Sequence, residues 1–362
     1  MSETLPRGPR ARLQFLDVVR GAAALLVMTE HALHMCVPAY YQFSKSYVVV
    51  GEAAILAFFM VSGFVIPMSL EEGRSLKQFW IRRVFRLFPV YWLSIALGFV
   101  VMLTQGYGAG AAVADVGTWV ANIFLLQSAL HLPHIWGAFW TLPYELTIYV
   151  VCASLYAIGV LGRIGPRFVG GLVVALIALG VAKPLLTGTP QSMDGGTIQV
   201  AMACLLGLLA HRHLAGQINR RSLYLSVSGL ATAMIVIWAV NHDLFPAMTV
   251  GRLVRFAGLW LLSAGSFFVL MERRNQPMPA VVSWLGRHSY PIYLLHPVAL
   301  TVLSRYQGSA WLFFPGVVGS TLLMAAVARQ LVELPGIAFG RRLEKRFAPS
   351  VAAPAAPLRR AA

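Results

Sequence analysis

Charged residues are scarce in this 362-residue chain, and acidic residues are the scarcest of them. Asp and Glu number 13 against 29 Lys and Arg, and charged residues make up 12% of the sequence, about half the usual 25% of a soluble domain. Hydrophobic residues make up 58%, and the mean hydropathy is +0.70. Apolar stretches of membrane-spanning length recur from end to end. The composition therefore excludes an ordinary soluble domain and predicts an all-α polytopic membrane protein.

Cysteine is also rare, because the chain has three. This odd number, with each cysteine in or beside an apolar stretch, indicates neither a disulfide framework nor a metal site, and we expect no bound metal. No glycine-rich phosphate loop is evident, which disfavours ATP and NAD as ligands. The basic first residues and the long, charged helix after them do not fit a cleavable signal peptide.

The net charge of +16 raises the question of nucleic-acid binding, but the basic residues fall in alternate short loops. That alternation is the positive-inside pattern of membrane proteins, so we expect a lipid bilayer as partner and no nucleic acid. It fits a bundle of about ten transmembrane helices with both termini cytoplasmic. The expected spans are roughly 16–36, 50–70, 88–104, 142–161, 167–186, 195–211, 221–240, 253–271, 289–304 and 313–333.

The remaining segments complete the expected domain organisation. The stretch 117–130 is apolar but too short to span, so we expect it to be re-entrant or interfacial. Residues 1–11 form a cytoplasmic segment, and 12–345 form the membrane domain. The tail 346–362 is rich in Ala and Pro and is predicted to be disordered and cytoplasmic.

The first span carries ionisable residues, which are costly in lipid and indicate function. Arg20 and His31 are eleven residues apart, so they project from one helical face about 16 Å apart along the axis. Asp17 lies one turn before Arg20 on the same stripe. A neutral imidazole in a low-dielectric cavity is a natural general base near neutral pH. The alternative is a snorkelling arginine and a hydrogen-bonded core histidine.

Residues 76–88 have the pattern of an interfacial amphipathic helix with an arginine face toward the cytosol. Arg82, Arg83 and Arg86 lie on that face. Guanidinium groups one turn apart suit the phosphates of a nucleotide-bearing ligand. An anchor for lipid headgroups is the alternative.

Two glutamates lie near the ends of predicted helices. Glu145 follows Pro143 at a helix N-terminus, where the helix dipole favours a carboxylate. The alternating loop charges put it at the outer face, away from the arginines, where it can contact a polar acceptor or orient a base. Glu333, before Pro335, ends the last span, and we interpret it as structural or as a partner for nearby arginines.

The segment 289–297 places three functional side chains at one-turn intervals. Tyr290, Tyr293 and His296 can line the same cavity wall. The alternative for His296 is a core histidine bound to a carbonyl that Pro297 leaves free.

The order of these motifs resembles the family-3 membrane acyltransferases, which O-acylate sugars and other secreted or envelope molecules. Each piece is short, but the ordered set is specific and covers about residues 12–345. The matching pieces are Leu16-Asp17-x-x-Arg20-Gly21, His31, Phe58-Phe59-x-x-Ser62-Gly63-Phe64, Arg83-x-x-Arg86-Leu87-x-Pro89-x-Tyr91, Trp140-Thr141-Leu142-x-x-Glu145, Ser289-Tyr290-x-x-Tyr293-Leu294-x-His296 and Glu333-x-Pro335.

The resemblance implies a protein of the bacterial inner membrane that takes an acyl group, usually acetyl, from cytosolic acyl-CoA. It delivers the group to a hydroxyl of an extracytoplasmic acceptor such as a polysaccharide, an O-antigen or another glycan. No cofactor is expected to be tightly bound, because acyl-CoA is the donor substrate. The expected site residues are His31, Arg20, Glu145 and Glu30 for catalysis, Arg82, Arg83 and Arg86 for the donor, and Asp17, Tyr290, Tyr293 and His296 for the substrate.

The chain departs from the family pattern in two respects. Glu30 stands where an apolar or aromatic residue is expected, and it either tunes His31 or reaches the outer interface. The soluble hydrolase-like domain fused to some relatives is missing, so we expect the chain to act alone or with a separate partner.

We hypothesise that His31 deprotonates the acceptor hydroxyl, which attacks the thioester, while Arg20 binds the donor or stabilises developing negative charge. A transient acyl-histidine is the alternative route. The rival function is a transporter or flippase for an anionic or glycolipid substrate, gated by a buried ion pair. The lack of paired inverted repeats with broken helices disfavours it.

Overall fold

The computed structural model describes residues 13–47, 50–72, 75–105, 115–188, 196–244 and 250–347, and these residues form helices and loops without strands. The ends of the chain, which include the predicted N-terminal segment and most of the tail, lie outside the described residues. Within the described part, each of the ten predicted spans overlaps one long helix. These are α1 (Gln14–Cys36), α3 (Val50–Glu71), α4 (Leu76–Gln105), α6 (Thr141–Ala157), α7 (Pro166–Thr187), α8 (Gly196–Leu214), α9 (Arg220–Leu244), α10 (Val250–Glu272), α11 (Ala280–Leu303) and α12 (Ala310–Ala328).

Six helical segments of the described residues are long and apolar enough to cross a membrane, and the chain is a multi-pass membrane protein. The exact number of ten spans stays a prediction. The six segments are Val50–Glu71, Leu76–Gln105, Gly137–Ala157, Pro166–Thr187, Val254–Glu272 and Ala310–Lys345.

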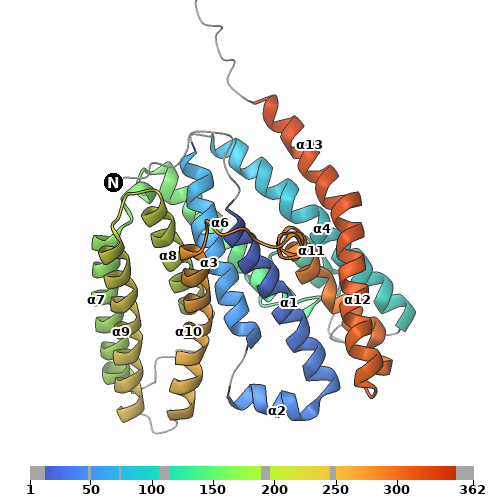
Figure 1. The fold of residues 1–362 in the computed structure, drawn as a ribbon, viewed down its shortest axis with the longest axis horizontal. Helices are drawn as coiled ribbons and strands as arrows, with labels where there is room; N and C mark the ends of the chain where they lie inside the picture. Colours follow the sequence, from blue (N-terminus) through green and yellow to red (C-terminus); the bar gives the residue numbers. More distant parts are fainter. Residues whose placement is uncertain are drawn as a thin grey trace, which may run out of the picture.

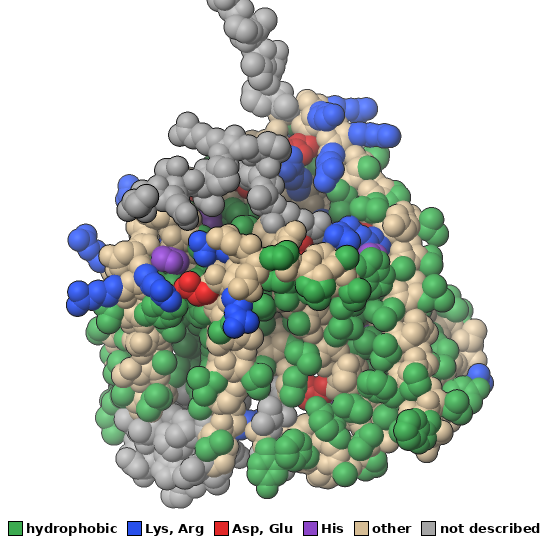
Figure 2. Space-filling model, viewed as in Figure 1, with side chains coloured by type: hydrophobic (Ala, Val, Ile, Leu, Met, Phe, Trp, Pro, Cys, Tyr) green, Lys and Arg blue, Asp and Glu red, His purple; other side chains and the backbone are tan. Residues whose placement is uncertain are grey.

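The surface agrees with a lipid environment. Figure 2 shows hydrophobic side chains over the sides of the molecule and Lys and Arg side chains gathered toward the end from which α13 (Leu334–Lys345) projects. Leu186, Leu261 and Trp311 are 83%, 75% and 90% exposed. Large apolar patches of this kind are unfavourable in water and are suited to lipid.

Helices α1 and α3 lie at the centre of the bundle, with α7 to α10 on one side and α4, α11 and α12 on the other (Figure 1). Helix α1 packs against α11 and α3, and α3 packs against α8. The short α2 (Pro38–Ser46) joins α1 to α3 across the end of the bundle opposite to α13 (Figure 1). The central position of α1 puts Arg20 and His31 inside the bundle.

Two glycines let α1 and α11 approach closely. A Cβ atom added at Gly21 would lie 2.7 Å from the amide nitrogen of Gly286, and one added at Gly286 would overlap the backbone of Asp17. Small residues at such crossings are the usual means of close helix packing in membranes. The crossing sets the register between α1, with Arg20 and His31, and the functional segment of α11.

We therefore expect Gly286→Ala to destabilise the bundle by about 1–3 kcal/mol, the usual cost of overpacking, and to lower its melting temperature. Gly265→Ala in α10 is the matched control, because nothing lies within 4 Å of a Cβ atom at that position. Alanine is the better helix former, so this control should leave the melting temperature unchanged or raise it. Thermal unfolding of both purified variants in detergent measures the difference, and equal melting temperatures would contradict the close crossing.

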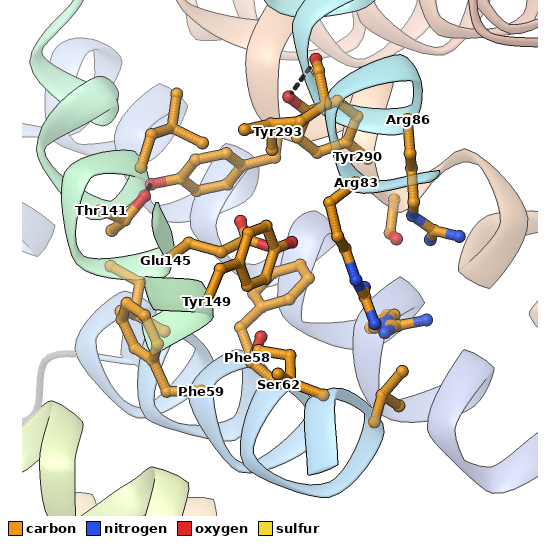
Figure 3. Close-up of a pocket in the computed structure, with 17 residues that line it drawn as sticks. Phe58, Phe59, Ser62, Arg83, Arg86, Thr141, Glu145, Tyr149, Tyr290 and Tyr293 are labelled. Carbon is orange, nitrogen blue, oxygen red and sulfur yellow. Dashed lines mark hydrogen bonds between the residues drawn. The ribbon is translucent and has the colours of Figure 1, made fainter. Parts of the chain in front are cut away.

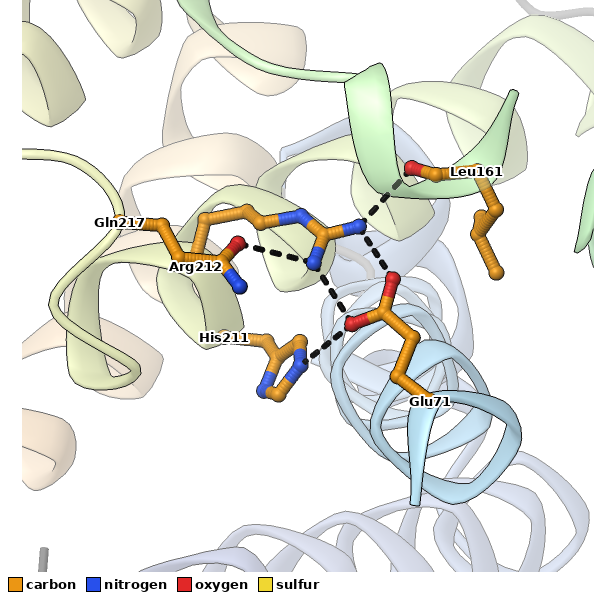
Figure 4. Close-up of polar contacts among 5 residues, drawn as sticks. All are labelled: Glu71, Leu161, His211, Arg212 and Gln217. Carbon is orange, nitrogen blue, oxygen red and sulfur yellow. Dashed lines mark hydrogen bonds and ion pairs between the residues drawn. The ribbon is translucent and has the colours of Figure 1, made fainter. Parts of the chain in front are cut away.

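Helices α3 and α8 are joined to the short segment η2 (Leu161–Arg163) by a buried ion pair (Figure 4). Arg212 is 2% exposed, and its two terminal nitrogens each lie 2.6 Å from a carboxylate oxygen of Glu71. The same guanidinium donates to the carbonyl of Leu161 and to the side chain of Gln217. A planar fork with this many partners holds the three segments in one arrangement.

The prediction of a separate interfacial helix at 76–88 is wrong in one respect. These residues form the first turns of α4, which continues through Pro89 for 30 residues in all. Proline is tolerated inside membrane helices because neighbouring groups satisfy the carbonyl that it leaves without a donor.

The last helix also continues where the sequence predicted an end. A π-helical turn, Arg329–Glu333, links α12 to α13 without a break, and Pro335 falls in the first turn of α13. The amide of Leu334 donates to the carbonyl of Arg329, five residues earlier, so the hydrogen-bond register shifts directly before the proline, which has no amide hydrogen. Glu333 accepts a hydrogen bond from Arg329 at 2.9 Å, which confirms its prediction as a partner for a nearby arginine.

Candidate active site

A narrow cavity of about 90 Å³ lies between α1, α3, α4, α6 and α11 (Figure 3). Basic and acidic side chains line it together with aromatic ones, which is unusual inside a membrane bundle and marks the site. The lining residues are Arg20, Ile55, Phe58, Phe59, Ser62, Val65, Ile66, Arg83, Arg86, Leu87, Thr141, Leu142, Glu145, Tyr149, Ser289, Tyr290 and Tyr293.

Three arginines give part of the cavity a positive charge. Arg20 of α1 lies within electrostatic range of Arg83 and Arg86 of α4. Arg86 is exposed, whereas Arg20 and Arg83 are half-buried, so the cationic part includes the mouth. The guanidinium of Arg83 lies 5.1 Å from the ring centre of Tyr149, which holds it toward the cavity. This group of cations is suited to an anionic ligand.

Arg82 does not belong to this group. Its Nε lies 2.6 Å from a carboxylate oxygen of Glu344 in α13. Consecutive residues of a helix point about 100° apart, so Arg82 faces α13 while Arg83 faces the cavity. Of the three predicted donor-binding arginines, the structure brings two to the cavity.

Glu145 lies beside the arginines, and the prediction that it sits away from them is wrong. It lines the same cavity as Arg20 and Arg83 and accepts a hydrogen bond from Tyr149, one turn later on α6 (Figure 3). The position of α6 explains the difference. The segment before α6 packs into the bundle, so α6 begins beside the cavity rather than at the outer surface.

That preceding segment is held by buried hydrogen bonds. The helix α5 (Val116–Ile123) has eight residues, about 12 Å, and does not span, as predicted for 117–130. Asn122, which is fully buried, receives a hydrogen bond from Tyr91 at its carbonyl. The indole of Trp136 donates to the carbonyl of Ser94 at 3.1 Å. Both contacts tie the loop to α4.

Two tyrosines of α11 line the cavity, as predicted. Tyr290 donates to the carbonyl of Leu87 at 2.7 Å. Tyr293 donates to the carbonyl of Ala138 at 2.7 Å and shares a hydrogen bond of 2.9 Å with Thr141 (Figure 3). Both hydroxyls are therefore used to connect α11 to neighbouring segments.

A histidine pair lies beyond Tyr293. The ring of Tyr293 packs against His296, with 5.7 Å between ring centres, and His296 Nε2 lies 3.0 Å from His31 Nδ1. His296 is fully buried and His31 is half-buried. Tyr293 thus stands between the arginine-lined cavity and the histidine pair.

Glu30 is turned toward α3 rather than toward His31. Its carboxylate accepts a hydrogen bond from the backbone amide of Gly51 in the first turn of α3, where the helix dipole favours a negative charge. It also lies 3.5 Å from His34. These contacts connect Glu30 to α3 and to His34. The predicted catalytic role of Glu30 stays a prediction. Asp17 is buried near Arg20 and outside the cavity lining.

Several residues that line the cavity have roles that their local sequence does not indicate. Tyr149 bonds Glu145, and the four-residue spacing of the two on a helix was the available signal. Thr141, which lies one turn before Glu145 in the same motif, shares a hydrogen bond with the hydroxyl of Tyr293. Nothing local to Phe58 predicts its contact with Tyr293, with 6.0 Å between the ring centres.

Three relatives show how widely the chain resembles known proteins. Nodulation protein 10 of Rhizobium leguminosarum bv. viciae is 26% identical over 89% of this chain and 92% of its own length. Exopolysaccharide production protein ExoZ of Rhizobium meliloti is 25% identical over 81% of this chain and 91% of its own. Peptidoglycan O-acetyltransferase OatA of Listeria monocytogenes is 22% identical over 91% of this chain and 57% of its own. No solved structure matches the chain.

The residues that match a known family include the helices that form the cavity. Residues 13–329 match the acyltransferase domain, and this range contains α1, α4, α6 and α11 with all their cavity-lining residues. The range also contains both histidines of the pair. The chain therefore belongs to the acyltransferase domain family and is a membrane-embedded acyltransferase.

Proposed function

We propose that this enzyme transfers an acetyl group from cytosolic acetyl-CoA to a hydroxyl of an extracytoplasmic glycan. The observation that carries the proposal is the arrangement of the charged and titratable side chains. Three arginines line the cavity, and the histidine pair lies beyond Tyr293. Coenzyme A is a polyanion, and guanidinium groups bind phosphates strongly. The relatives whose names mention exopolysaccharide and peptidoglycan support a glycan acceptor.

The proposed reaction begins when His31 removes the proton of the acceptor hydroxyl. The oxygen attacks the thioester carbonyl, a carbon–oxygen bond forms, and the carbon–sulfur bond breaks. The CoA thiolate leaves and takes the proton from His31, which restores the neutral imidazole. If His31 instead accepts the acyl group first, labelled acetyl-CoA without an acceptor should label the protein.

The position of Arg20 supports donor binding rather than stabilisation of the reacting carbonyl. Arg20 and His31 are eleven residues apart on one helix, or about 16 Å along its axis. That separation is of the same order as the extended pantetheine arm of CoA. A donor with its phosphates at Arg20, Arg83 and Arg86 therefore reaches toward His31 with its thioester end.

The transporter alternative is not retained, because the chain belongs to an acyltransferase family. The positive-inside pattern supports a cytoplasmic location for both termini in a bacterial inner membrane. The first turns of α4, with Arg82, Arg83 and Arg86, carry several of the basic residues of that side, and His31 lies deeper in the bundle. We therefore propose that donor and acceptor enter from opposite sides.

Sealed proteoliposomes test this arrangement, with orientation determined from protease access to a C-terminal tag. The donor is radiolabelled acetyl-CoA, and the acceptor probe is chemically de-O-acetylated surface polysaccharide from the source strain. Neither compound crosses a bilayer. Labelled polysaccharide is expected when acetyl-CoA is on the side of the C-terminus and polysaccharide is on the other. Product with both compounds on the C-terminal side would instead show an ordinary inner-face transferase.

A further inference from the structure

The contact between His31 and His296 joins the two helices of the site. His31 Nδ1 and His296 Nε2 are 3.0 Å apart. One of these nitrogens therefore carries a hydrogen and donates it in a hydrogen bond, and the other accepts that hydrogen bond. A histidine whose Nδ1 holds the proton has its lone pair at Nε2, and the reverse tautomer has it at Nδ1. The direction of this one hydrogen bond therefore decides which nitrogen of His31 can act as a base.

The surroundings of the second nitrogen of His296 determine that direction. His296 is fully buried, and its Nδ1 has no hydrogen-bond partner among the described residues. The backbone carbonyls of Ile292 and Tyr293 face this ring. A protonated Nδ1 would direct its hydrogen toward these oxygens, whereas an unprotonated Nδ1 would place its lone pair against theirs.

Pro297 strengthens this preference. In a helix, the amide of residue 297 would donate to the carbonyl of Tyr293, and proline has no amide hydrogen. The Tyr293 carbonyl is therefore left with acceptor capacity, directly beside the imidazole one turn later. The sequence Tyr293-x-x-His296-Pro297 thus supplies both the ring and its acceptor within one turn of α11.

We propose that His296 is a positioning residue, which fixes His31 in the tautomer that carries its proton on Nδ1 and its lone pair on Nε2. With the His296 proton on Nδ1, His296 Nε2 accepts and His31 Nδ1 donates. The Nε2 of His31, which is the ring nitrogen not bonded to His296, is then the base. A second group that holds the Nδ1 proton has the same effect in hydrolase triads. The proposal rests on the general-base role of His31 proposed above.

The test compares three variants at position 296. The amide oxygen of Gln can replace Nε2 as acceptor, so His296→Gln should keep activity within a few-fold of the native enzyme. His296→Leu removes the acceptor and should lower acyl transfer about 10- to 100-fold, as expected when the partner that orients a histidine is removed. Asn is too short to reach the place of Nε2, so His296→Asn should resemble the Leu variant. Alkali-released envelope O-acetate in a deletion strain, normalised to folded membrane protein, measures the effect.

A spectroscopic readout separates positioning from mere packing. In 15N-histidine NMR spectra of the protein in lipid nanodiscs, the signals of His31 are identified as those lost in His31→Asn. We expect a single Nδ1–H tautomer for His31 in the native protein and in His296→Gln, and a mixture of tautomers in His296→Leu. An Nε2–H tautomer of native His31 would overturn the proposal, and so would full activity of folded His296→Leu.

The native spectrum decides the proposal even if the Leu variant does not fold. Failure of the proposed general-base role of His31 would give a different result from failure of the positioning role of His296. If His31→Asn keeps its acyl transfer, the general-base role is lost whichever tautomer is observed. If His31→Asn is inactive and the tautomer is Nε2–H, the base role stands and the positioning role of His296 falls.

Discussion

Replacement of His31 by alanine is expected to reduce acyl transfer by at least about 100-fold, the lower end of the usual contribution of a general base. The side chain is half-buried and has its hydrogen-bonded contact with His296 as its link to α11. Gly21 and Gly286 hold the crossing of α1 and α11 without it. The variant should therefore fold and enter the membrane normally while the chemistry is lost.

His34→Ala is the matched control for this prediction. His34 lies one turn later on α1, and its Nε2 is 2.6 Å from the hydroxyl of Ser44 in α2. It contacts the connection at the end of the bundle rather than the histidine pair, so we expect at most a few-fold loss of activity. Both variants are compared by envelope O-acetate content and by gel filtration in detergent. Substantial activity of well-folded His31→Ala would exclude His31 as the base.

The double variant Arg83→Ala/Arg86→Ala is expected to weaken acetyl-CoA binding by about 10- to 100-fold for each arginine removed. The reason is that a hydrogen bond to a charged group contributes about 1.5–3 kcal/mol. Both guanidinium groups line the cavity. Equilibrium dialysis of labelled acetyl-CoA with the purified protein measures the change and needs no acceptor.

Arg82→Ala removes the same charge from the same helix and is the matched control. Arg82 binds Glu344 of α13 and does not line the cavity, so its loss should leave the dissociation constant for acetyl-CoA within about two-fold. If all the variants bind acetyl-CoA like the native protein, the arginines of α4 are anchors for lipid headgroups. If Arg82→Ala and the double variant weaken binding equally, the effect is one of general surface charge.

Features that depend on one helix could be predicted from the sequence. The long helices follow from apolar stretches, and the common face of Arg20 and His31 follows from their spacing. The same spacing predicts Tyr290, Tyr293 and His296 on one cavity wall. The two tyrosines line the cavity, whereas His296 lies outside its lining and contacts His31. These inferences need the helical period and no knowledge of tertiary structure.

Features that depend on distant contacts could not be predicted in this way. Glu145 reaches the arginines because Trp136 and Asn122 tie the loop before α6 to α4, and no local pattern reports such a contact. Arg82 and Arg83 stand together on the polar side of an amphipathic pattern. Their separation depends on the position of α13, which supplies Glu344 to one of them.

Tyr293 has a consequence for the membrane itself. An enzyme that admits a donor from one side and an acceptor from the other risks a continuous water path, along which protons could run down their gradient. The hydroxyl of Tyr293 is bonded to Ala138 and Thr141, and its ring lies between the polar cavity and His296. Neither imidazole lines the cavity, so the acyl group of a donor bound at the arginines must pass the Tyr293 ring to reach His31. We therefore expect the Tyr293 side chain, in this position, to limit the leakage of protons through the enzyme.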